Sequence, residues 1–352
     1  MGHGVKHAAV VLGVLGAVLA SIAVSITVGP ADLTTADVVA VVVAHLGGPA
    51  AEVSRIQDGI VWEMRLPRAV LAALCGTGLA LCGAVMQSML RNRLADPFVL
   101  GISSGASTGA VTVAVLGIGA GVLSLSSGAF VGALVSFVLV MMLATGAGGG
   151  TGPVILAGVA GTQLFSALTS FIVLSSADAE QTRGVLFWLL GSLAGADWAD
   201  VWACAGAVGL GMVVCVIAAP SLDAMTLGSD TATALGVPIL RLKVILLGVT
   251  ALMTATIVAA AGAIGFVGLV LPHAARLLVG PRHSRLLPTT MAMGAVFMVW
   301  ADTLARSIFS PQEIPVGVVT ALVGVPAFAA ILLRGQRWGR GVRSAPRLVA
   351  AR

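Results

Sequence analysis

The chain has 352 residues, of which 58% are hydrophobic and 9% are charged, with a formal net charge of +5 at pH 7. Soluble domains carry about 25% charged residues, so this composition excludes an ordinary soluble enzyme or binding module. It predicts an all-α, polytopic membrane protein. The 45 glycines suit helices that pack closely in a bilayer.

Apolar segments long enough to cross a bilayer recur along the whole chain and predict about ten transmembrane helices in a single domain, residues 1–352. They lie near residues 8–28, 69–90, 98–118, 122–145, 153–175, 201–219, 244–264, 265–280, 289–309 and 315–334. The first could instead be the core of a cleaved signal peptide. Its apolar run continues to Val28, beyond the usual length of such a core, which favours a retained span.

Two connections are expected to hold short helices outside the bilayer. Residues 31–64 form the longest external connection, and their mixed pattern predicts a surface helix near 35–46. Residues 185–193 resemble a short interfacial helix. Trp188, Trp198 and Trp202 would anchor the outer boundary, where tryptophan is enriched.

The distribution of Lys and Arg predicts the orientation, because cytoplasmic connections carry an excess of both. With both termini inside, fourteen of the 19 basic residues fall on the cytoplasmic side, including the arginines of a basic tail at 335–352. The outside keeps five arginines beside most of the acids. The net charge therefore reflects orientation and not nucleic-acid binding.

Arg65 and Arg68, in the sequence RLPR, share one face of the predicted first turn of the second span, with Pro67 between them. Two cations at a helix N-terminus oppose the helix dipole and lie on the side that the charge rule depletes. They could reach lipid phosphates or pair with Glu63. The alternative is an acidic partner that docks from outside.

Residues 221–243 form the longest polar interruption in the second half of the chain. Ser221 is expected to cap a short helix over 222–227 that ends at Gly228, and Ser229 to cap a second over 230–235 that ends at Gly236. Helices this short are unstable alone. The segment is therefore either an ordinary capped loop or a cytoplasmic knob that packs on its own bundle or in a partner's groove.

Two further sites depart from a plain apolar span. Asp302 and Arg306 are four residues apart near the outer end of the ninth span, so they either neutralise each other or let Arg306 join Arg65 and Arg68 in an external basic ring. His273 follows Pro272 without a second His or acid at helical spacing, which favours a packed histidine over a proton relay or ligand.

Several chemistries are not predicted. The glycine-rich stretch at 146–153 lacks the Lys and Ser/Thr of a phosphate-binding loop, so we expect a cytoplasmic turn and no nucleotide hydrolysis by this chain. We find no Ser/His/Asp set in a plausible pocket and no metal site, the pair His3 and His7 being a weak signal. The four cysteines fall in apolar segments and are interpreted as small apolar side chains.

Four stretches recur in order along the chain: IVWEMRLPRAVLAALCGTGLALCGAVMQSMLRNRLADPFVLGISSGASTGA at 60–110, SLDAMTLGSDTATALGV at 221–237, GAIGFVGLVLPHAARL at 262–277 and ADTLARSIFSPQEIPVGVVTALVGVPAFAAILL at 301–333. Together they resemble the FecCD-type permeases, the membrane subunits of ABC importers for ferric siderophores, haem and vitamin B12. One departure is Arg93, where the family has proline in NPLADP, which leaves the shape of that loop in doubt.

The resemblance implies a type II ABC importer permease fold and a dimer of permeases, either a homodimer or a pair with a paralogue. It implies a separate ATP-binding subunit that uses ATP and Mg²⁺, an extracytoplasmic substrate-binding protein, and a cytoplasmic (inner) membrane location. This chain would be a transport subunit with no cofactor, catalytic residue or metal of its own.

The resemblance also implies roles for particular residues, which fall into three sets. Residues 221–243 would be cytoplasmic coupling helices that contact the ATPase through Leu222, Ala224, Met225, Leu227, Gly228, Ala232, Leu235 and Gly236. Arg65, Arg68 and Arg306 would face acidic residues of the binding protein. The translocation path would include Gln87, Gly101, Ser104, Gly105, Gly265 and Gly268, with the glycines allowing close helix approach and movement.

The expected function is ATP-driven import by alternating access, with a ferric siderophore as the first choice of cargo and haem or cobalamin as the others. The main alternative is an ion-coupled secondary transporter, which should show mid-membrane carboxylates, broken helices and an inverted repeat. Asp302 is its candidate acid within a span, and no clear repeat is visible. A channel or structural subunit would need neither a capped knob nor external arginines.

Overall fold

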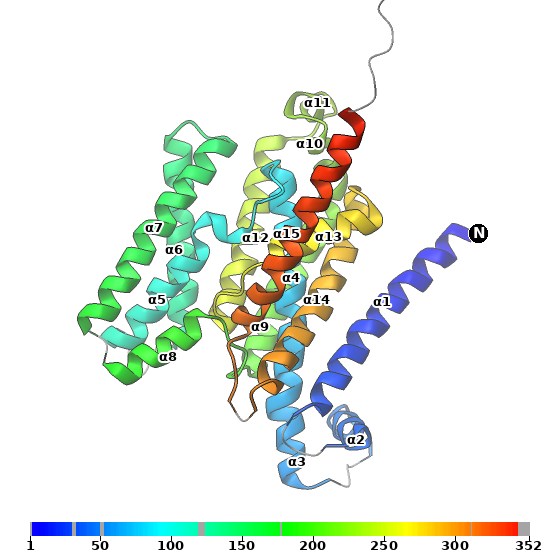
Figure 1. The fold of residues 1–352 in the computed structure, drawn as a ribbon, viewed down its shortest axis with the longest axis vertical. Helices are drawn as coiled ribbons and strands as arrows, with labels where there is room; N and C mark the ends of the chain where they lie inside the picture. The colour runs from blue at the N-terminus through cyan, green and yellow to red at the C-terminus, as the bar shows by residue number, and fades with distance from the viewer. Residues whose placement is uncertain are drawn as a thin grey trace, which may run out of the picture.

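The computed structural model describes residues 2–29, 33–49, 53–118, 124–176, 178–310 and 312–343, and all regular structure in them is helical (Figure 1). The helices are α1 (Gly2–Thr27), α2 (Thr35–His45), α3 (Arg55–Gly59), η1 (Ile60–Arg65), α4 (Leu66–Met89), η2 (Pro97–Leu100), α5 (Ile102–Leu116), α6 (Leu125–Gly146), α7 (Thr151–Ser176), α8 (Ala179–Leu189), α9 (Trp198–Ile217), α10 (Ala219–Thr226), α11 (Ser229–Ala234), α12 (Ile239–Ala261), α13 (Val267–Val279), α14 (His283–Ser307) and α15 (Val316–Arg343).

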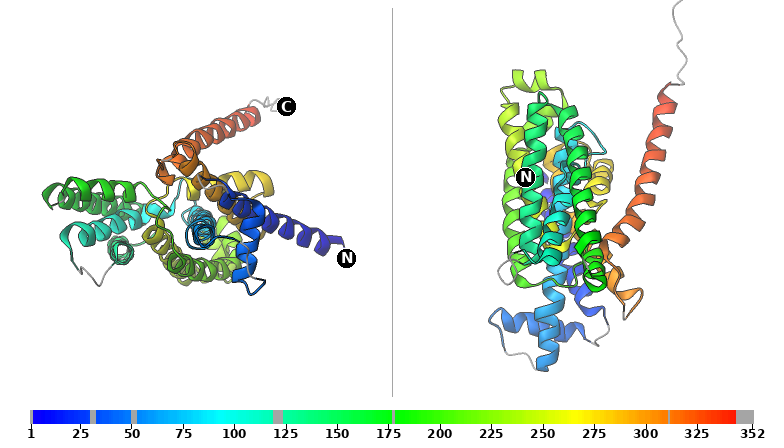
Figure 2. Two further views of the ribbon diagram at one scale, coloured as in Figure 1. Left: turned by 90° about the horizontal axis from the view of Figure 1, so that it is seen from below. Right: turned by 90° about the vertical axis from the view of Figure 1, so that its left-hand side faces the viewer.

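Helix α4 lies at the centre of the bundle and is buried along nearly its whole length. Helices α9, α12, α13 and α14 pack around it, while α5, α6 and α7 form a second group at one side (Figure 1). Figure 2 shows α1 and α15 diverging from the bundle. A helix surrounded by protein must tolerate close neighbours, and α4 meets this with Ala, Gly and Cys at many of its buried positions.

Each predicted span contains a helix, but the helices differ in length. Five helical segments in the described residues are long and apolar enough to cross a membrane: Arg55–Met89, Leu125–Gly146, Thr151–Ser175, Trp198–Ile217 and Ile239–Ala261. The predicted spans 98–118 and 265–280 are wrong in extent, because α5 has 15 residues and α13 has 13. At 1.5 Å per residue, α13 is only about 20 Å long, against about 30 Å of hydrocarbon.

The second span does not begin where the sequence suggested. Residues 55–89 are continuously helical, so Arg65 and Arg68 lie well inside the helix and not in its first turn. Pro67 cannot donate a backbone hydrogen bond to the preceding turn. The π-helical turn at Ile60–Arg65 lies just before Pro67. Such a turn is one way in which a helix accommodates the hydrogen bond that proline cannot make.

The external connection forms a small subdomain at one end of the bundle. Helix α2 confirms the predicted surface helix, and a capping box between Thr34 and Asp37 fixes its start. Its apolar face packs on Ile26 and Val61, which holds the subdomain against α1 and η1. The second predicted interfacial helix begins six residues earlier than expected: α8 runs from Ala179 with Asp178 as its cap.

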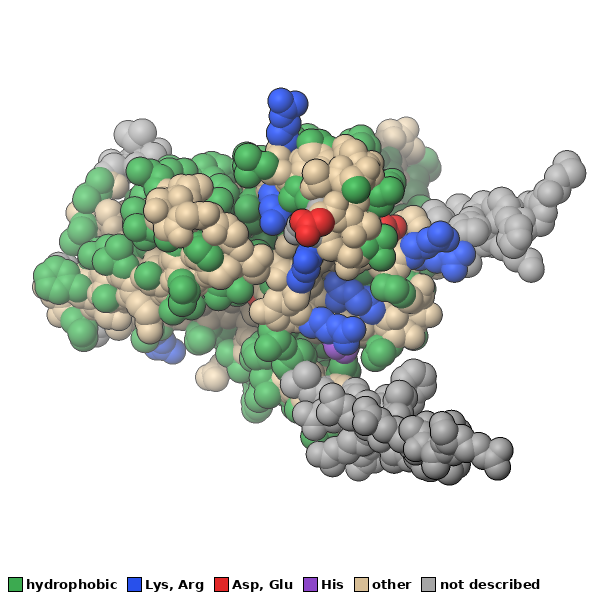
Figure 3. Space-filling model, turned by 90° about the horizontal axis from the view of Figure 1, so that it is seen from above, with side chains coloured by type: hydrophobic (Ala, Val, Ile, Leu, Met, Phe, Trp, Pro, Cys, Tyr) green, Lys and Arg blue, Asp and Glu red, His purple; other side chains and the backbone are tan. Residues whose placement is uncertain are grey.

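Two sets of short helices mark opposite ends of the molecule. Helices α10 and α11 lie at one end of the bundle, and α2 and α3 lie at the other (Figure 1). Viewed from the α10–α11 end, Lys and Arg side chains gather on the surface around these helices (Figure 3). The basic tail was predicted at 335–352: the helix continues to Arg343, and residues 344–352 lie outside the described residues.

Candidate functional sites at the two ends of the bundle

Helices α10 and α11 form a knob that is half anchored and half exposed. Leu222, Met225 and Ala232 are fully buried against the bundle, and Ala224 packs partly against the same core. Leu227 and Leu235, in contrast, are 68% and 64% exposed. Because the anchored residues fix the knob, the two leucines present an apolar surface of defined position away from the bundle.

The predicted caps of the knob are wrong, although its two helices and their glycines are where expected. Helix α10 begins at Ala219 with Pro220 in its first turn, so Ser221 lies inside the helix. Helix α11 begins at Ser229, and its N-cap residue is Gly228. Gly228 and Gly236 both have positive φ, 125° and 82°, which explains glycine at these two turns.

A Ser/His/Asp set joins the knob to the bundle, although it lines none of the pockets described here. His283, the first residue of α14, contacts Asp223 of α10 through Nδ1 at 2.6 Å and Ser88 of α4 through Nε2 at 2.6 Å. His283 and Ser88 are buried, with His283 only 1% exposed, whereas the Asp223 side chain is 36% exposed. The members of the set are 60 and 195 residues apart in sequence, so no local pattern could have revealed it.

At the opposite end, Arg68 of α4 is held by two carboxylates. Its Nε and Nη2 donate to Asp302 of α14 at 2.9–3.1 Å, and its Nη1 donates to Glu313 at 2.9–3.1 Å. The side chains of Arg68 and Asp302 are 12% and 2% exposed, so this is a nearly buried ion pair. Arg68 thus pairs with Asp302 and Glu313 and not with Glu63, the partner named in one of the two sequence-based alternatives.

Arg65 and Arg306 hold the C-terminal end of α1. Arg65 donates to Ile26 O at 2.8 Å, and Arg306 donates to Val28 O at 2.7 Å and to Ser25 O. The last carbonyls of a helix have no partner within it and carry a partial negative charge. The two guanidinium groups therefore act as C-terminal caps supplied by other helices.

The three arginines lie at one end of the bundle, as the external-ring hypothesis requires, but their side chains are turned inward. Arg306 lies 3.8 Å from Asp302, its neighbour on α14, while Arg68 makes the shorter contacts with that acid. This end of the bundle holds three guanidinium groups and only two nearby carboxylates, Asp302 and Glu313, so it carries an excess of positive charge. Docking through these residues stays a prediction, and it would require a partner carboxylate to join or displace the internal ones.

The residues predicted to line the path fall in different environments. Gln87 is buried, donates to the carbonyls of Gly268 and Leu269 at 3.3 and 3.1 Å, and accepts from Arg276. Gly101 has φ 72° and ends η2. An added Cβ at Gly105 would overlap with α6, and one at Gly268 would crowd α4 and the turn before η2. Gly265 meets open space, so its expected role in close helix approach is wrong.

Ser104 lines a cavity of about 470 Å³ between α5 and α7. Seven hydroxyl side chains line it: Ser103, Ser104, Ser107, Thr162, Ser166, Thr169 and Ser170. The remaining lining residues are Phe98, Leu189 and Ala263. Hydroxyl groups both donate and accept hydrogen bonds, so this pocket suits a hydrated, polar molecule without fixing its charge.

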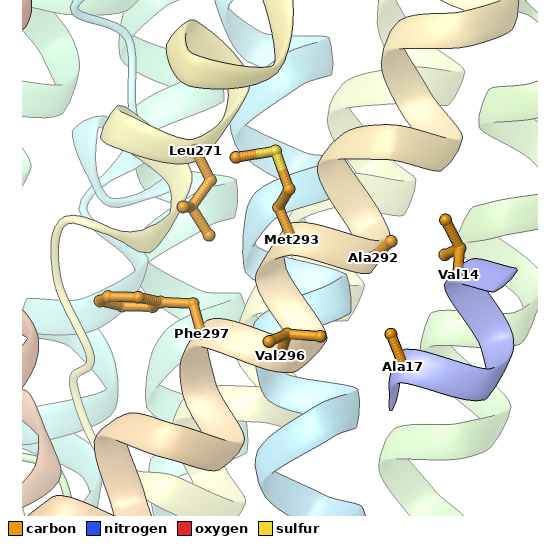
Figure 4. Close-up of a pocket in the computed structure, with 7 residues that line it drawn as sticks. All are labelled: Val14, Ala17, Leu271, Ala292, Met293, Val296 and Phe297. Carbon is orange, nitrogen blue, oxygen red and sulfur yellow. The ribbon is translucent and has the colours of Figure 1, made fainter. Parts of the chain in front are cut away.

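A second cavity, of about 450 Å³, is wholly apolar. Figure 4 shows Val14 and Ala17 of α1 facing Ala292 and Val296 of α14, with Leu271, Met293 and Phe297 completing the lining. It lies where α1 diverges from the bundle. Without a polar group it can hold apolar chains but offers no specificity.

His273 is half-buried, whereas all four cysteines are buried. His273 lies in α13 directly after Pro272, and its Nδ1 is buried without a hydrogen-bond partner. All four cysteines are buried and free. Among the described residues, no three His, Cys, Asp or Glu side chains could hold a metal ion.

The model of the FecCD transport family matches residues 17–334, nearly the whole chain. The chain belongs to the FecCD transport family. It is 43% identical over 274 residues to the cobalamin import system permease protein BtuC of Halobacterium salinarum, covering 78% of this chain and 73% of that one. It is 40% identical over 279 residues to the Fe(3+) dicitrate transport system permease protein FecD of Escherichia coli, covering 78% and 85%.

A solved structure supports the same assignment. The chain superposes on a metal-chelate type ABC transporter in an inward-facing conformation with a TM-score of 0.81, at 30% identity, covering 92% of this chain and 99% of that one. The FecCD-family chain is thus a multi-pass membrane permease of the ABC importer type. The predicted family and helical permease fold are confirmed.

Proposed function

We propose that this chain is the membrane-spanning subunit of an ATP-driven importer that moves a ferric siderophore from an extracytoplasmic binding protein to the cytoplasm. The observation that carries the proposal is the knob at one end, where Leu227 and Leu235 are exposed on short helices whose other faces are anchored. A chain without a nucleotide-binding loop needs such a contact to receive work from a separate ATPase.

The rest of the assembly follows from this assignment. The α10–α11 end would face the cytoplasm together with both termini, in agreement with the basic residues gathered there (Figure 3). ATP and Mg²⁺ would bind to the partner ATPase, and this chain would need no cofactor. A second permease, identical or paralogous, would complete the path, and the Arg68 end would receive the binding protein.

Transport would then occur by alternating access. ATP-driven closure of the ATPase subunits would displace α10 and α11, and the bundle would open the path to one side at a time. The hydroxyl-lined cavity between α5 and α7 is the best candidate for the part of the path contributed by this chain. It could hydrogen-bond a hydrated chelate without binding it so tightly that release is prevented.

Cobalamin is the second candidate cargo, because the relative from Halobacterium salinarum named for cobalamin import shares 43% identity with this chain. The ferric chelate is supported by the relatedness to the dicitrate permease, at 40% identity. The two cargoes need the same fold and differ in the binding protein that delivers them.

Uptake in vesicles tests the proposal. The permease is reconstituted with its ATPase and binding protein, and uptake of a radiolabelled ferric siderophore is compared with that of labelled cobalamin, with and without ATP. Uptake of the siderophore that depends on ATP is expected. Uptake driven by an ion gradient in the absence of the ATPase would instead favour a secondary transporter, a reading that Asp302 does not support because Arg68 already neutralises it.

A further inference from the structure

His283 joins three helices through three hydrogen bonds. Its backbone N–H donates to Asp223 Oδ1 at 2.9 Å, its Nδ1 lies 2.6 Å from the same oxygen, and its Nε2 lies 2.6 Å from Ser88 Oγ. Nδ1 faces a carboxylate and donates to it, while Nε2 contacts the Ser88 hydroxyl, which itself donates to Ala84 O at 2.9 Å. One side chain thus connects α10, α14 and α4.

Asp223 serves α14 as a cap supplied by another helix. The N-cap residue of α14, Arg282, makes no side-chain cap, so the first N–H groups of this 25-residue helix need other acceptors. Asp223 takes one of them and places a negative charge at the positive end of the helix dipole. Because α10 has only eight residues, contacts of this kind decide how it is oriented.

Helices α4 and α14 are fixed to each other at three levels. Ser88 and His283 connect them at the α10 end, and Arg68 and Asp302 at the opposite end. Between these, Gly76 and Gly294 let the backbones touch, and a Cβ added at either would overlap with the carbonyl oxygen of the other. Sliding one helix past the other would break both polar contacts, so the pair is built to move as one body.

We propose that His283 is a positioning residue that fastens the coupling helix α10 to the α4–α14 pair, so that displacement of α10 moves both helices together. A movement imposed at the knob then reaches Arg68 and Asp302 at the far end without loss. This inference rests on the proposed function, since it assigns α10 the task of receiving work from the ATPase.

The charged and titratable groups around His283 agree with this role. It faces Asp223 from α10, the Ser88 hydroxyl from α4 and the charge of Arg276 from α13. Burial lowers the pKa of His283, which lies at the α10 end of its helix, although Asp223 acts in the opposite direction. The Nδ1 contact with Asp223 and the Nε2 contact with Ser88 hold the ring between these groups.

The test compares two substitutions in the complete importer. His283→Asn keeps an amide donor close to the position of Nδ1 and so retains the contact with Asp223, whereas His283→Gln moves the amide beyond it. Vesicle uptake gives the number of ATP molecules hydrolysed per substrate transported. We expect at most about a twofold change in this ratio for Asn and an increase of about tenfold for Gln, with ATP hydrolysis itself within about twofold of the parent.

Thr290→Val is the matched control, because Thr290 is buried on the same helix and its hydroxyl has no hydrogen-bond partner. This substitution should leave the number of ATP molecules hydrolysed per substrate transported unchanged. An unchanged ratio in His283→Gln as well would overturn the inference while leaving the proposed function intact. Failure of the parent protein to take up either cargo with ATP would instead refute the proposed function and, with it, the inference.

A distance measurement covers the case in which a variant no longer transports. Spin labels at Thr226→Cys on α10 and Leu304→Cys on α14, both exposed positions, report whether the two helices move together. Their separation should be the same with and without ATP in the parent. In His283→Ala it should shift or broaden by about 5 Å, one helical turn. A separation that changes with ATP in the parent contradicts the proposal.

Discussion

At the scale of single residues, Arg68, Asp302 and His283 matter because each is largely buried and held by a partner. Arg68 is held by Asp302 and Glu313, and His283 by Asp223 and Ser88. Removing one member of a buried ion pair leaves the other as a buried charge without a partner, which is strongly destabilising. Replacing both members with apolar groups leaves no buried charge. This difference distinguishes buried pairs from exposed charges.

Arg68→Ala should lower the free energy of unfolding by about 3–5 kcal/mol, because it leaves the Asp302 carboxylate buried without its main partner. Arg68→Met combined with Asp302→Leu should recover most of the loss. Arg183→Ala, at an exposed position on α8, is the control and should change stability by no more than about 0.5 kcal/mol. Thermal unfolding in detergent measures all three. Equal losses in the single and double variants would contradict the pairing.

Asp96, in the turn between α4 and α5, should make stability depend on pH. Burial raises the pKa of Asp96 to about 6. The hydrogen bond that its carboxylate accepts from the Phe98 N–H lowers the pKa, but by less. Between about pH 4 and 6 the folded protein therefore retains a proton that the unfolded chain has lost, so stability falls as the pH rises through this range.

Asp96→Asn keeps an acceptor for the Phe98 N–H and removes the titrating group. The melting temperature of the parent should fall relative to that of the variant as the pH is raised from 4 to 6.5. Asp230→Asn, at an exposed position on α11, is the control. A constant difference between parent and Asp96→Asn across this range would show that the carboxyl group is not protonated in the fold.

At the scale of helices, close backbone contacts decide which elements form a unit. Helices α4 and α14 touch at Gly76 and Gly294, and α5 and α6 touch at Gly109 and Gly128. In a bilayer, such contacts replace the hydrophobic drive that holds soluble helices together. At Gly265, between α12 and α13, an added Cβ would meet no such neighbour.

Gly76→Ala should destabilise the protein by about 1–3 kcal/mol, because the new methyl group meets backbone atoms that cannot move aside. Gly265→Ala is the matched substitution, since an added Cβ there meets open space, and it should be tolerated. The two melting temperatures in detergent give the comparison. Equal tolerance at both positions would mean that α4 and α14 are not closely packed.

At the scale of the whole molecule, the two ends differ in what they expose. The α10–α11 end offers exposed leucines beside basic residues, while at the opposite end Arg65, Arg68 and Arg306 are turned inward onto internal partners. The first surface suits a stable apolar contact with a partner, and the second suits a transient electrostatic one. Central α4 connects them.

Leu227→Glu together with Leu235→Glu should reduce recovery of the ATPase subunit with the purified permease by at least about tenfold, because a charge placed in an apolar contact is not compensated there. The permease itself should remain folded, since both side chains are exposed. Leu46→Glu, at an equally exposed position beyond α2, is the control. Undiminished recovery of the ATPase would show that its contact lies elsewhere.

The sequence by itself determined the membrane class, the helical segments, the family and the two-helix knob between Ala219 and Ala234, because apolar periodicity and turn-forming glycines are local signals. The tertiary structure alone decided the partners of the charged residues. Arg68 meets Asp302 across 234 residues, and His283 meets Ser88 across 195. Such pairs depend on which helices become neighbours, and a burial penalty exists only once the chain has packed.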